Sequence, residues 1–266
     1  MFRSSTSYNG KKSVGLIMLI KNKKIVTCVM VVLLFFSMLV VAKETADFVV
    51  SERLLTDKST PVVIDAGHGA EDSGKVGIGG VLEKDINLSI ALRLKELLQQ
   101  QDIRVVMTRE DDKGTFPNTG SNRKVRDMQN RVERINKERP ALVISIHQNS
   151  FPDESVSGAQ TFYFEGSEEG KRAAEILQKQ LIATLQPKKE RVAKANSSYY
   201  LLKNTEYPIT IVECGFLTNR QETKKLCDEE YQEQIAWAIH LGVLQYLNTG
   251  GTVTNEMDEN TNQNNN

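Results

Sequence analysis

The alternation of apolar and polar positions from Pro61 onward predicts strands and helices in turn. Short runs rich in β-branched residues predict strands over Val62–Asp65, Ile103–Thr108, Ala141–Ile146, Ala159–Phe164, Ile209–Glu213 and, more briefly, Tyr199–Leu202. Longer stretches with apolar residues three or four positions apart predict helices over Asp85–Gln101, Ser121–Glu138, Glu168–Leu185 and Tyr231–Leu247. In the first of these helices, Ile86, Ile90 and Leu94 share one face.

Strands that alternate with helices of this length predict an α/β fold. We expect a single domain over residues 61–248, with a mostly parallel central sheet flanked by helices on both faces. The polar stretch 43–60 is predicted to be a linker. Residues 249–266, rich in Asn and Thr, are predicted to form a disordered tail because they contain almost nothing to bury.

The N-terminal residues have the pattern of an export segment. An uncharged apolar run of 18 residues, 25–42, follows a basic segment over residues 1–24. At about 1.5 Å per residue, a helix of this length measures roughly 27 Å, close to the thickness of a bilayer core. The basic flank predicts that the rest of the chain lies outside the cytoplasmic membrane. Two readings stay open: an uncleaved membrane anchor, and a signal sequence cleaved after Ala42.

Composition narrows the classes of function. The formal net charge is zero and the sequence pI is near 6.9. Because nucleic-acid-binding proteins usually carry a basic excess, no nucleic-acid partner is expected. The three cysteines, Cys28, Cys214 and Cys227, form no Cys-x-x-Cys pair and are too few for a disulfide scaffold. A disulfide between Cys214 and Cys227 and two buried free thiols both fit the sequence.

Three residues have the character of metal ligands. His68 lies between two glycines directly after the first predicted strand. The glycines permit a sharp turn, and open α/β sheets bind ligands at the carboxyl ends of their strands. Glu83 precedes the first predicted helix, and His147 follows the third predicted strand. Two histidines and one glutamate form a catalytic zinc set that leaves the fourth position to water, so we expect one Zn²⁺ per chain.

Each of these residues taken alone has a structural alternative. His68 fits a turn residue, Glu83 fits a first-turn glutamate favoured by the helix dipole, and His147 fits a core histidine bonded to a backbone carbonyl. The metal site is favoured because the chain has three histidines and two of them end predicted strands. The third, His240, falls within the amphipathic C-terminal helix and is interpreted as structural.

Glu213 is the candidate catalytic carboxylate. It ends the strongly β-branched run Ile209–Glu213, where apolar surroundings would raise its pKa by desolvation. A carboxyl group of raised pKa suits a general base that takes a proton from water and passes it to a leaving amine. A solvent-facing strand end is the structural alternative.

The motifs of the chain, taken in order, resemble those of the zinc-dependent N-acetylmuramoyl-L-alanine amidases. They are V-I-D-A-G-H-G, L-E-K-D-I-N-L, M-T-R, S-I-H-Q-N and V-E-C-G-F-L-T-N, spread over about residues 61–248. The single-domain layout, the leader and the stretch N-R-K-V-R-D-M-Q-N-R-V-E-R-I-N are similar to the germination-specific, or spore cortex, branch. One departure is Ala70, which stands where many members have a second glycine.

This resemblance implies zinc ligands at His68, Glu83 and His147 and a catalytic carboxylate at Glu213. It implies hydrolysis of the amide between N-acetylmuramic acid and L-alanine in peptidoglycan. For the spore cortex branch, it implies a role in forming muramic-δ-lactam on the cortex side of a bacterial forespore. The expected partners are the peptidoglycan and, through the N-terminal segment, the membrane. The need for an activating protein partner stays open.

Arg109, Arg131 and Asn149 are further candidates for binding substrate or supporting a ligand, with structural ion pairs as the alternative for the arginines. A second hypothesis for the whole chain is a non-catalytic peptidoglycan-binding or scaffold module of the same fold. Such a module would be expected to lack a ligand or the catalytic carboxylate, and all four are present. A zinc exopeptidase would need a second metal site, for which Asp65 is the one obvious spare ligand near the first histidine.

Overall fold

The computed structural model describes residues 30–32, 34–38, 60–112 and 123–250. The chain divides into two compact units, Met1–Arg53 and Leu54–Asn266. In the first unit, the described residues are helical and their side chains are exposed. None of the helices in these described ranges is both long and apolar enough to cross a membrane. The predicted basic segment lies outside the described residues, as do most of the export segment, the linker and the tail.

A six-stranded sheet forms the centre of the described part of the second unit. Its strands are β1 (Val62–Ala66), β2 (Val105–Met107), β3 (Leu142–Asn149), β4 (Gln160–Tyr163), β5 (Lys194–Ala195) and β6 (Ile209–Phe216). They lie in the order β2-β1-β3-β6-β4-β5. The pairs β1–β2, β1–β3, β3–β6 and β4–β5 are parallel, and β4 runs antiparallel to β6. The predicted α/β fold with a mostly parallel sheet is confirmed.

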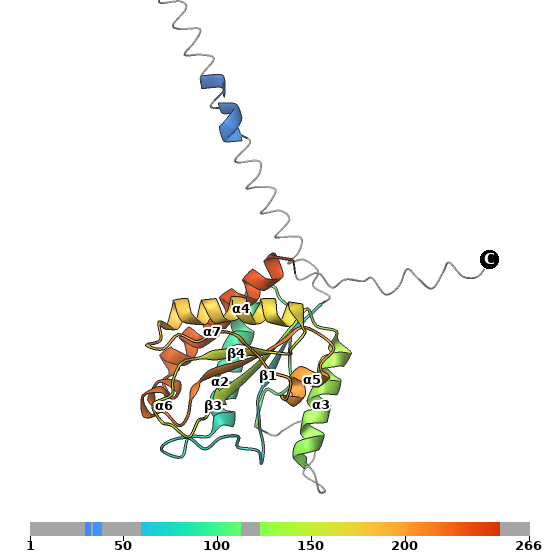
Figure 1. Cartoon of the computed structure of the whole chain (residues 1–266). Helices are drawn as coiled ribbons and strands as arrows, with labels where there is room; N and C mark the ends of the chain where they lie inside the picture. Colours follow the sequence, from blue (N-terminus) through green and yellow to red (C-terminus); the bar gives the residue numbers. More distant parts are fainter. Residues whose placement is uncertain (1–29, 33, 39–59, 113–122, 251–266) are drawn as a thin grey trace, which may run out of the picture. The chain divides into compact units, whose positions relative to one another are not determined.

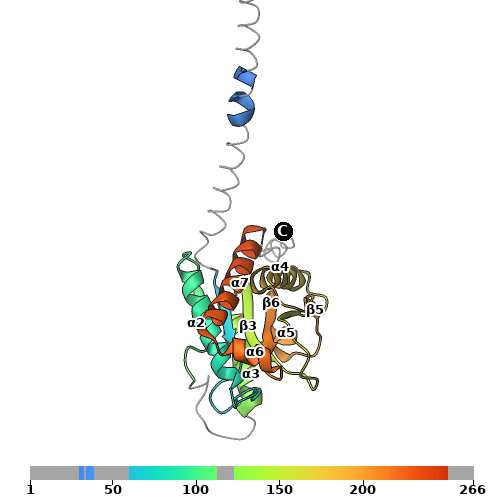
Figure 2. The same cartoon turned by 90° about the vertical axis from the view of Figure 1, so that its left-hand side faces the viewer.

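Helices cover both faces of this sheet, as predicted (Figure 1). They are α2 (Glu83–Gln99), α3 (Arg123–Glu138), α4 (Glu168–Leu185), α5 (Tyr200–Asn204), α6 (Arg220–Leu226) and α7 (Glu229–Asn248). Helices α2, α4 and α7 pack together on one face, with α7 between the other two (Figure 2). Helices α3 and α5 contact each other and the opposite face.

Alternate residues of the central strands build two hydrophobic cores, because successive side chains of a strand point to opposite faces. Ile64, Ile144 and Val212 belong to the core beneath α2, α4 and α7. Val63 and Val143 belong to the core beneath α3 and α5. All five side chains are fully buried. The sheet is therefore buried from both sides, which explains why its central strands read as nearly continuous apolar runs.

His147 and Glu213 are neighbours on the α3/α5 face of the sheet. The parallel register of β3 and β6 pairs these two residues, and each lies an even number of positions from core residues of that face. Both strands continue beyond their predicted ends, to Asn149 and Phe216. His147 and Glu213 consequently lie within these strands rather than just after them or at their ends.

The predicted strand over Tyr199–Leu202 is wrong, because most of this run forms helix α5. The side-chain oxygen Oδ1 of Asn196 accepts the backbone N–H of Tyr199 at 2.9 Å and so turns the chain into the helix. Leu201 and Leu202 are 2% and 1% exposed, so the apolar run buries one side of a single helical turn. Strand β5 and helix α6 were not predicted.

Candidate metal centre

The loop after β1 brings His68 back over the carboxyl edge of the sheet. The backbone of His68 has a positive φ of 62°, which is uncommon for a residue with a Cβ. Two glycines allow close approach: a Cβ at Gly67 would lie 2.3 Å from Cε1 of His147, and one at Gly74 would lie 2.6 Å from Oε2 of Glu83. Because any larger residue at either position would displace a candidate ligand, these glycines are part of the site.

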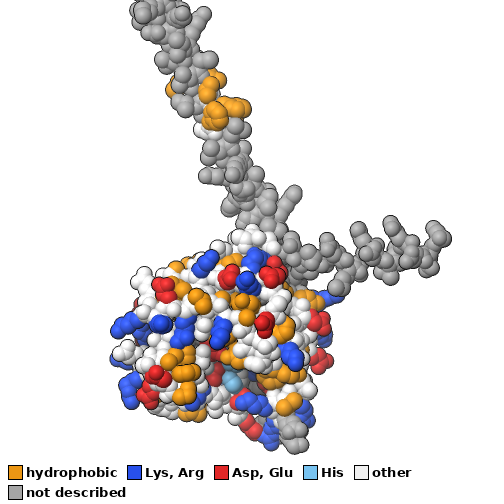
Figure 3. Space-filling view, in the orientation of Figure 1, with side chains coloured by type: hydrophobic (Ala, Val, Ile, Leu, Met, Phe, Trp, Pro, Cys, Tyr) orange, Lys and Arg blue, Asp and Glu red, His pale blue; other side chains and the backbone are white. Residues whose placement is uncertain are grey.

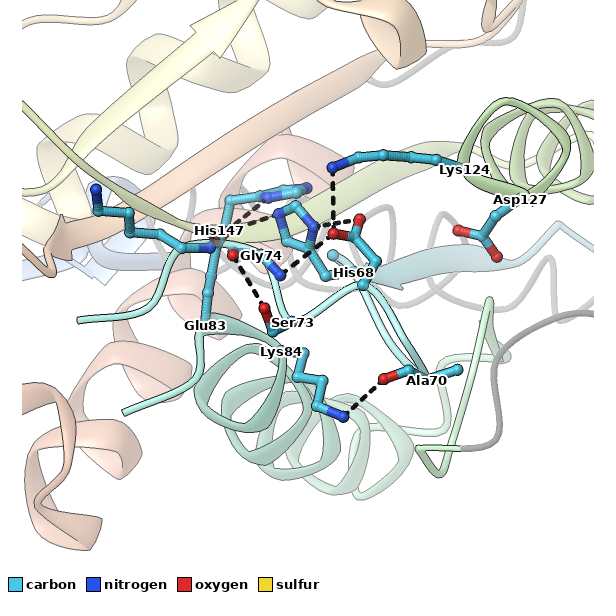
Figure 4. Close-up of polar contacts among 12 residues, drawn as sticks. His68, Ala70, Ser73, Gly74, Glu83, Lys84, Lys124, Asp127 and His147 are labelled. Carbon is cyan, nitrogen blue, oxygen red and sulfur yellow. Dashed lines mark hydrogen bonds and ion pairs between the residues drawn. The ribbon is translucent and has the colours of Figure 1, made fainter. Parts of the chain in front are cut away.

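His68, Glu83 and His147 converge at one point (Figure 4). Oε1 of Glu83 lies 3.2 Å from Nε2 of His68 and 3.0 Å from Nδ1 of His147. Two ligands that each lie about 2.0–2.1 Å from a tetrahedral zinc are roughly 3.3 Å apart, so these spacings fit such an ion. Among the described residues, no other group of histidine, cysteine and acidic side chains has metal-ligand spacing. A histidine side chain is visible in a hollow of the surface (Figure 3).

Glu83 is held in place from three directions, although it is the first residue of α2. Its Oε2 accepts the backbone N–H of Lys75 at 2.8 Å. Its Oε1 accepts the backbone N–H of Gln148 at 3.0 Å and the side-chain amide of Asn87 at 3.4 Å. The carboxylate is only 3% exposed. This arrangement positions Oε1 between the two histidines.

The charges at this centre favour a cation. Burial opposes ionisation of Glu83, but hydrogen bonds and charges from His147 and His68 outweigh burial and keep the pKa of Glu83 far below its usual range. Burial disfavours a charged His68, yet its hydrogen bonds to Asp72 and Glu83 raise its pKa to about 9. Because a metal ion replaces the protons of its ligands, metal binding here would release protons.

Glu213 faces this centre from the neighbouring strand. It is 8% exposed, and its Oε2 has no hydrogen-bond partner within the described part of the chain. Burial is the main reason that its pKa is raised to about 7; the charge of Glu83 raises it too, against the opposing effect of His147 and His68. The direction agrees with the sequence-based expectation. A buried carboxylate oxygen without a partner is suited to bind a water molecule or a substrate N–H group.

Arg131 is a buried structural residue rather than an exposed one. It is 1% exposed, and its guanidinium donates to Oδ1 of Asp65 at 2.6 Å and to Oδ2 of Asp127 at 2.7 Å. It also donates to the backbone carbonyl oxygen of His68. Asp65 therefore anchors α3 to the loop that carries the first histidine, and it is not a spare ligand for a second metal.

Arg109 and Asn149 also make local contacts. The Arg109 guanidinium donates to the carbonyl oxygens of Ala66 at 2.9 Å, Gly67 at 3.0 Å and Lys84 at 2.8 Å, and so supports the same loop. The side chain of Asn149 accepts the backbone N–H that follows it at 2.8 Å. The structure thus brings both arginines beneath the His68 loop, and it places Asn149 at the end of β3.

Two residues that surround the ligands were not singled out from the sequence. Oδ2 of Asp72 lies 2.8 Å from Nδ1 of His68. Asn87, which is fully buried, donates to the carbonyl oxygen of Gly67 at 3.1 Å as well as to Glu83. The position of Asn87 one turn after Glu83 on a predicted helix was a usable signal, since residues four apart share a helical face. Asp72 lies in a loop, where spacing predicts no contact.

The third histidine and the two described cysteines are not part of the ligand cluster. His240 is 2% exposed within α7, and its ring lies 5.2 Å from that of Trp237, which agrees with a structural interpretation. Cys214 and Cys227 are free thiols, the first buried and the second exposed. Burial raises the pKa of Cys214 far above its usual range, so this thiol is inert at neutral pH.

Fold and site together define an α/β enzyme domain with a two-histidine, one-glutamate centre at the carboxyl edge of a mostly parallel sheet. Solved structures of the same build include the CwlD amidase from Clostridioides difficile in complex with the GerS lipoprotein. It shares 37% identity with this chain at a TM-score of 0.69, covering 72% of this chain and all of that one. The amidase AmiC2 of Nostoc punctiforme shares 34% identity at a TM-score of 0.63, covering 71% and 97%.

Residues 62–245 match the family model described as N-acetylmuramoyl-L-alanine amidase. A germination-specific N-acetylmuramoyl-L-alanine amidase of Bacillus subtilis is 38% identical over 193 residues, which are 71% of this chain and 81% of that protein. The chain belongs to the N-acetylmuramoyl-L-alanine amidase family, whose members hydrolyse peptidoglycan. The resemblance seen in the sequence and the predicted enzyme class are both confirmed.

Proposed function

We propose that this amidase is zinc-dependent, with His68, Glu83 and His147 as the zinc ligands and Glu213 as the catalytic carboxylate. The observation that carries this proposal is that one ligand atom from each of these three residues lies within 4.8 Å of the others. Oε1 of Glu83 is 3.2 Å from Nε2 of His68 and 3.0 Å from Nδ1 of His147. A two-histidine, one-glutamate set leaves a fourth position for water or substrate, which distinguishes catalytic zinc sites from closed structural ones.

A bound zinc ion supplies Lewis-acid chemistry, because it polarises a carbonyl oxygen and lowers the pKa of water. The residues of the chain supply the proton transfers. Glu213 takes a proton from the attacking water through its unpartnered Oε2 and then delivers it to the amide nitrogen of L-alanine, which leaves as an amine. Its pKa of about 7 suits both steps, although a divalent cation nearby would lower that value.

The substrate of the proposed reaction is the amide between N-acetylmuramic acid and L-alanine. The similarity to the germination-specific amidase of Bacillus subtilis supports a role in the spore cortex. There, removal of the peptide stem would precede closure of muramic-δ-lactam. This role requires action outside the cytoplasm, and the apolar run at residues 25–42 would serve as signal or anchor. By analogy with the C. difficile CwlD amidase and the GerS lipoprotein, a protein partner is a further expectation.

A matched pair of variants tests this assignment. Glu213→Gln should retain zinc but lose stem-peptide release by about a hundredfold or more, because it removes the proton carrier and leaves the ligands intact. His147→Ala should lose the metal itself. Release at the wild-type rate by Glu213→Gln, or stoichiometric zinc in His147→Ala, would remove that residue from its proposed role. If the wild-type protein binds zinc but releases no stem peptide, the alternative of a non-catalytic peptidoglycan-binding or scaffold module is favoured instead.

A further inference from the structure

The side chain of Asp72 contacts the edge of His68 that faces away from the other ligands. Oδ2 of Asp72 lies 2.8 Å from Nδ1 of His68, whereas Nε2 lies 3.2 Å from Oε1 of Glu83. The two nitrogens of this ring thus face two different carboxylates. Figure 4 shows His68 between Glu83 on one side and the carboxylate that pairs with Lys124 on the other.

The carboxylate of Asp72 is itself fixed. Its Oδ1 lies 3.1 Å from Nζ of Lys124 on α3 and accepts the backbone N–H of Gly74 at 3.4 Å. Its backbone N–H and carbonyl group both bond with Gly69 at 3.0 Å, which closes the loop into a tight bridge. With Oδ1 engaged elsewhere, Oδ2 is directed at the histidine.

An ionised carboxylate has acceptor oxygens only, so without a metal ion both ring nitrogens carry a proton, Nδ1 towards Asp72 and Nε2 towards Glu83. A metal ion bound beside Glu83 would replace the proton on Nε2 and leave the proton on Nδ1. A neutral imidazole that is protonated at Nδ1 has its lone pair at Nε2, on the edge that faces Glu83. We propose that Asp72 is a positioning residue that fixes the ring orientation and tautomer of His68, so that Nε2 is the nitrogen presented to the metal. This inference rests on the proposed zinc function and deepens it.

The expected effect is on metal affinity. Carboxylates that accept the second ring N–H of a ligating histidine typically contribute about 10- to 100-fold in affinity, because they orient the ring and raise its basicity. Asp72→Ala in the full chain should therefore weaken zinc binding by roughly that factor, measured by competition with a chromogenic chelator. Asp72→Asn keeps an acceptor oxygen without the charge and should lie between Asp72→Ala and wild type.

Glu71→Ala is the matched control. Glu71 precedes Asp72 in the same loop. Its carboxylate pairs with the exposed Arg123, which lies next to Lys124 on α3. The control removes the same charge but no contact with His68, so its zinc affinity should equal that of wild type. In the zinc-loaded protein, the Nδ1 proton of His68 should give a slowly exchanging imidazole resonance that Glu71→Ala keeps and Asp72→Ala loses.

The outcomes separate the two proposals. Zinc affinity of Asp72→Ala within about threefold of wild type, with the resonance retained, overturns the positioning role alone. A wild-type protein that binds no zinc, or a His68→Ala variant that binds it normally, overturns the zinc site itself. If Asp72→Ala does not fold, Asp72→Asn decides, since it preserves the shape of the side chain.

Discussion

Substitution of Asp65 by asparagine tests the buried ion pair that fixes α3 to the loop carrying His68. Asp65 is 0% exposed and Arg131 is 1% exposed. Oδ1 of Asp65 also accepts from the hydroxyl of Thr108 at 2.7 Å, and Oδ2 accepts from the hydroxyl of Ser145 at 2.6 Å. Asparagine preserves the shape but removes the buried one of the two carboxylates that pair with Arg131, leaving only Asp127.

The loss of stability expected for Asp65→Asn follows from the burial of the Asp65–Arg131 ion pair. Removal of one partner from a buried ion pair destabilises a protein by about 3–5 kcal/mol when the remaining charge is left uncompensated. Because Asp127 still pairs with Arg131, we expect the lower end of this range, about 3 kcal/mol. For a domain of this size, this loss should lower the melting temperature by about 10 °C. Burial by itself would raise the pKa of Asp65, but the Arg131 charge, assisted by the two hydroxyl groups, outweighs it and lowers the pKa from 3.8 to about 2.

The depressed pKa also predicts how the effect depends on pH. A shift from 3.8 to about 2 corresponds to about 2 kcal/mol of stability in the folded protein. Because the folded pKa is the lower one, this stability is fully present above the unfolded pKa near pH 4. It is lost as the pH falls towards 2. The difference between wild type and Asp65→Asn should therefore shrink across that window.

Urea unfolding at pH 7 and at steps between pH 4 and pH 2 measures both quantities. Glu138→Gln is the control, since its pair with Arg104 joins side chains that are 25% and 47% exposed. The control should change the free energy of unfolding by less than about 1 kcal/mol. A change below about 1 kcal/mol in Asp65→Asn as well would refute the reasoning.

Two further substitutions test the packing around the ligands. Gly67→Ala places a Cβ 2.3 Å from Cε1 of His147 and should lower the zinc content well below that of wild type. The control Gly166→Ala, with φ 90° and open space at the Cβ, should reduce stability by about 1–3 kcal/mol without changing the zinc content. Asn87→Leu removes one of the two donors to the carbonyl oxygen of Gly67 and the Oδ1 that accepts from the buried Gln148 amide. It should reduce the unfolding free energy by about 1–3 kcal/mol in urea. An unchanged zinc content in Gly67→Ala or an unchanged unfolding midpoint in Asn87→Leu would contradict these accounts.

Patterns with a local cause were the most predictable from the sequence. The period of apolar residues placed α4 at its observed bounds, because that helix buries one continuous stripe. The grouping of His68, Glu83 and His147 was also predictable from the order of strands and helices. The first two residues flank the loop between β1 and α2, and the third belongs to the adjacent parallel strand β3.

Features that depend on tertiary contacts were beyond sequence reasoning. Leu201 and Leu202 read as part of a strand, but the turn set by Asn196 made them helical. Arg131 was a candidate from the sequence, and its pair with Asp127 four residues earlier is local, but its contact with Asp65 depends on how α3 packs against β1. Asp72 reaches His68 through a loop held by positive φ angles and by a backbone bridge to Gly69, neither of which any periodicity encodes.

The most direct test of the central claim is a paired measurement on the purified protein: its zinc content, and the release of stem peptides from purified cortex or vegetative peptidoglycan with and without a chelator. The account predicts about one zinc per chain and release that the chelator abolishes and added zinc restores. Release that proceeds unchanged in a protein stripped of metal would contradict the account, because His68, Glu83 and His147 would then not form a catalytic metal centre.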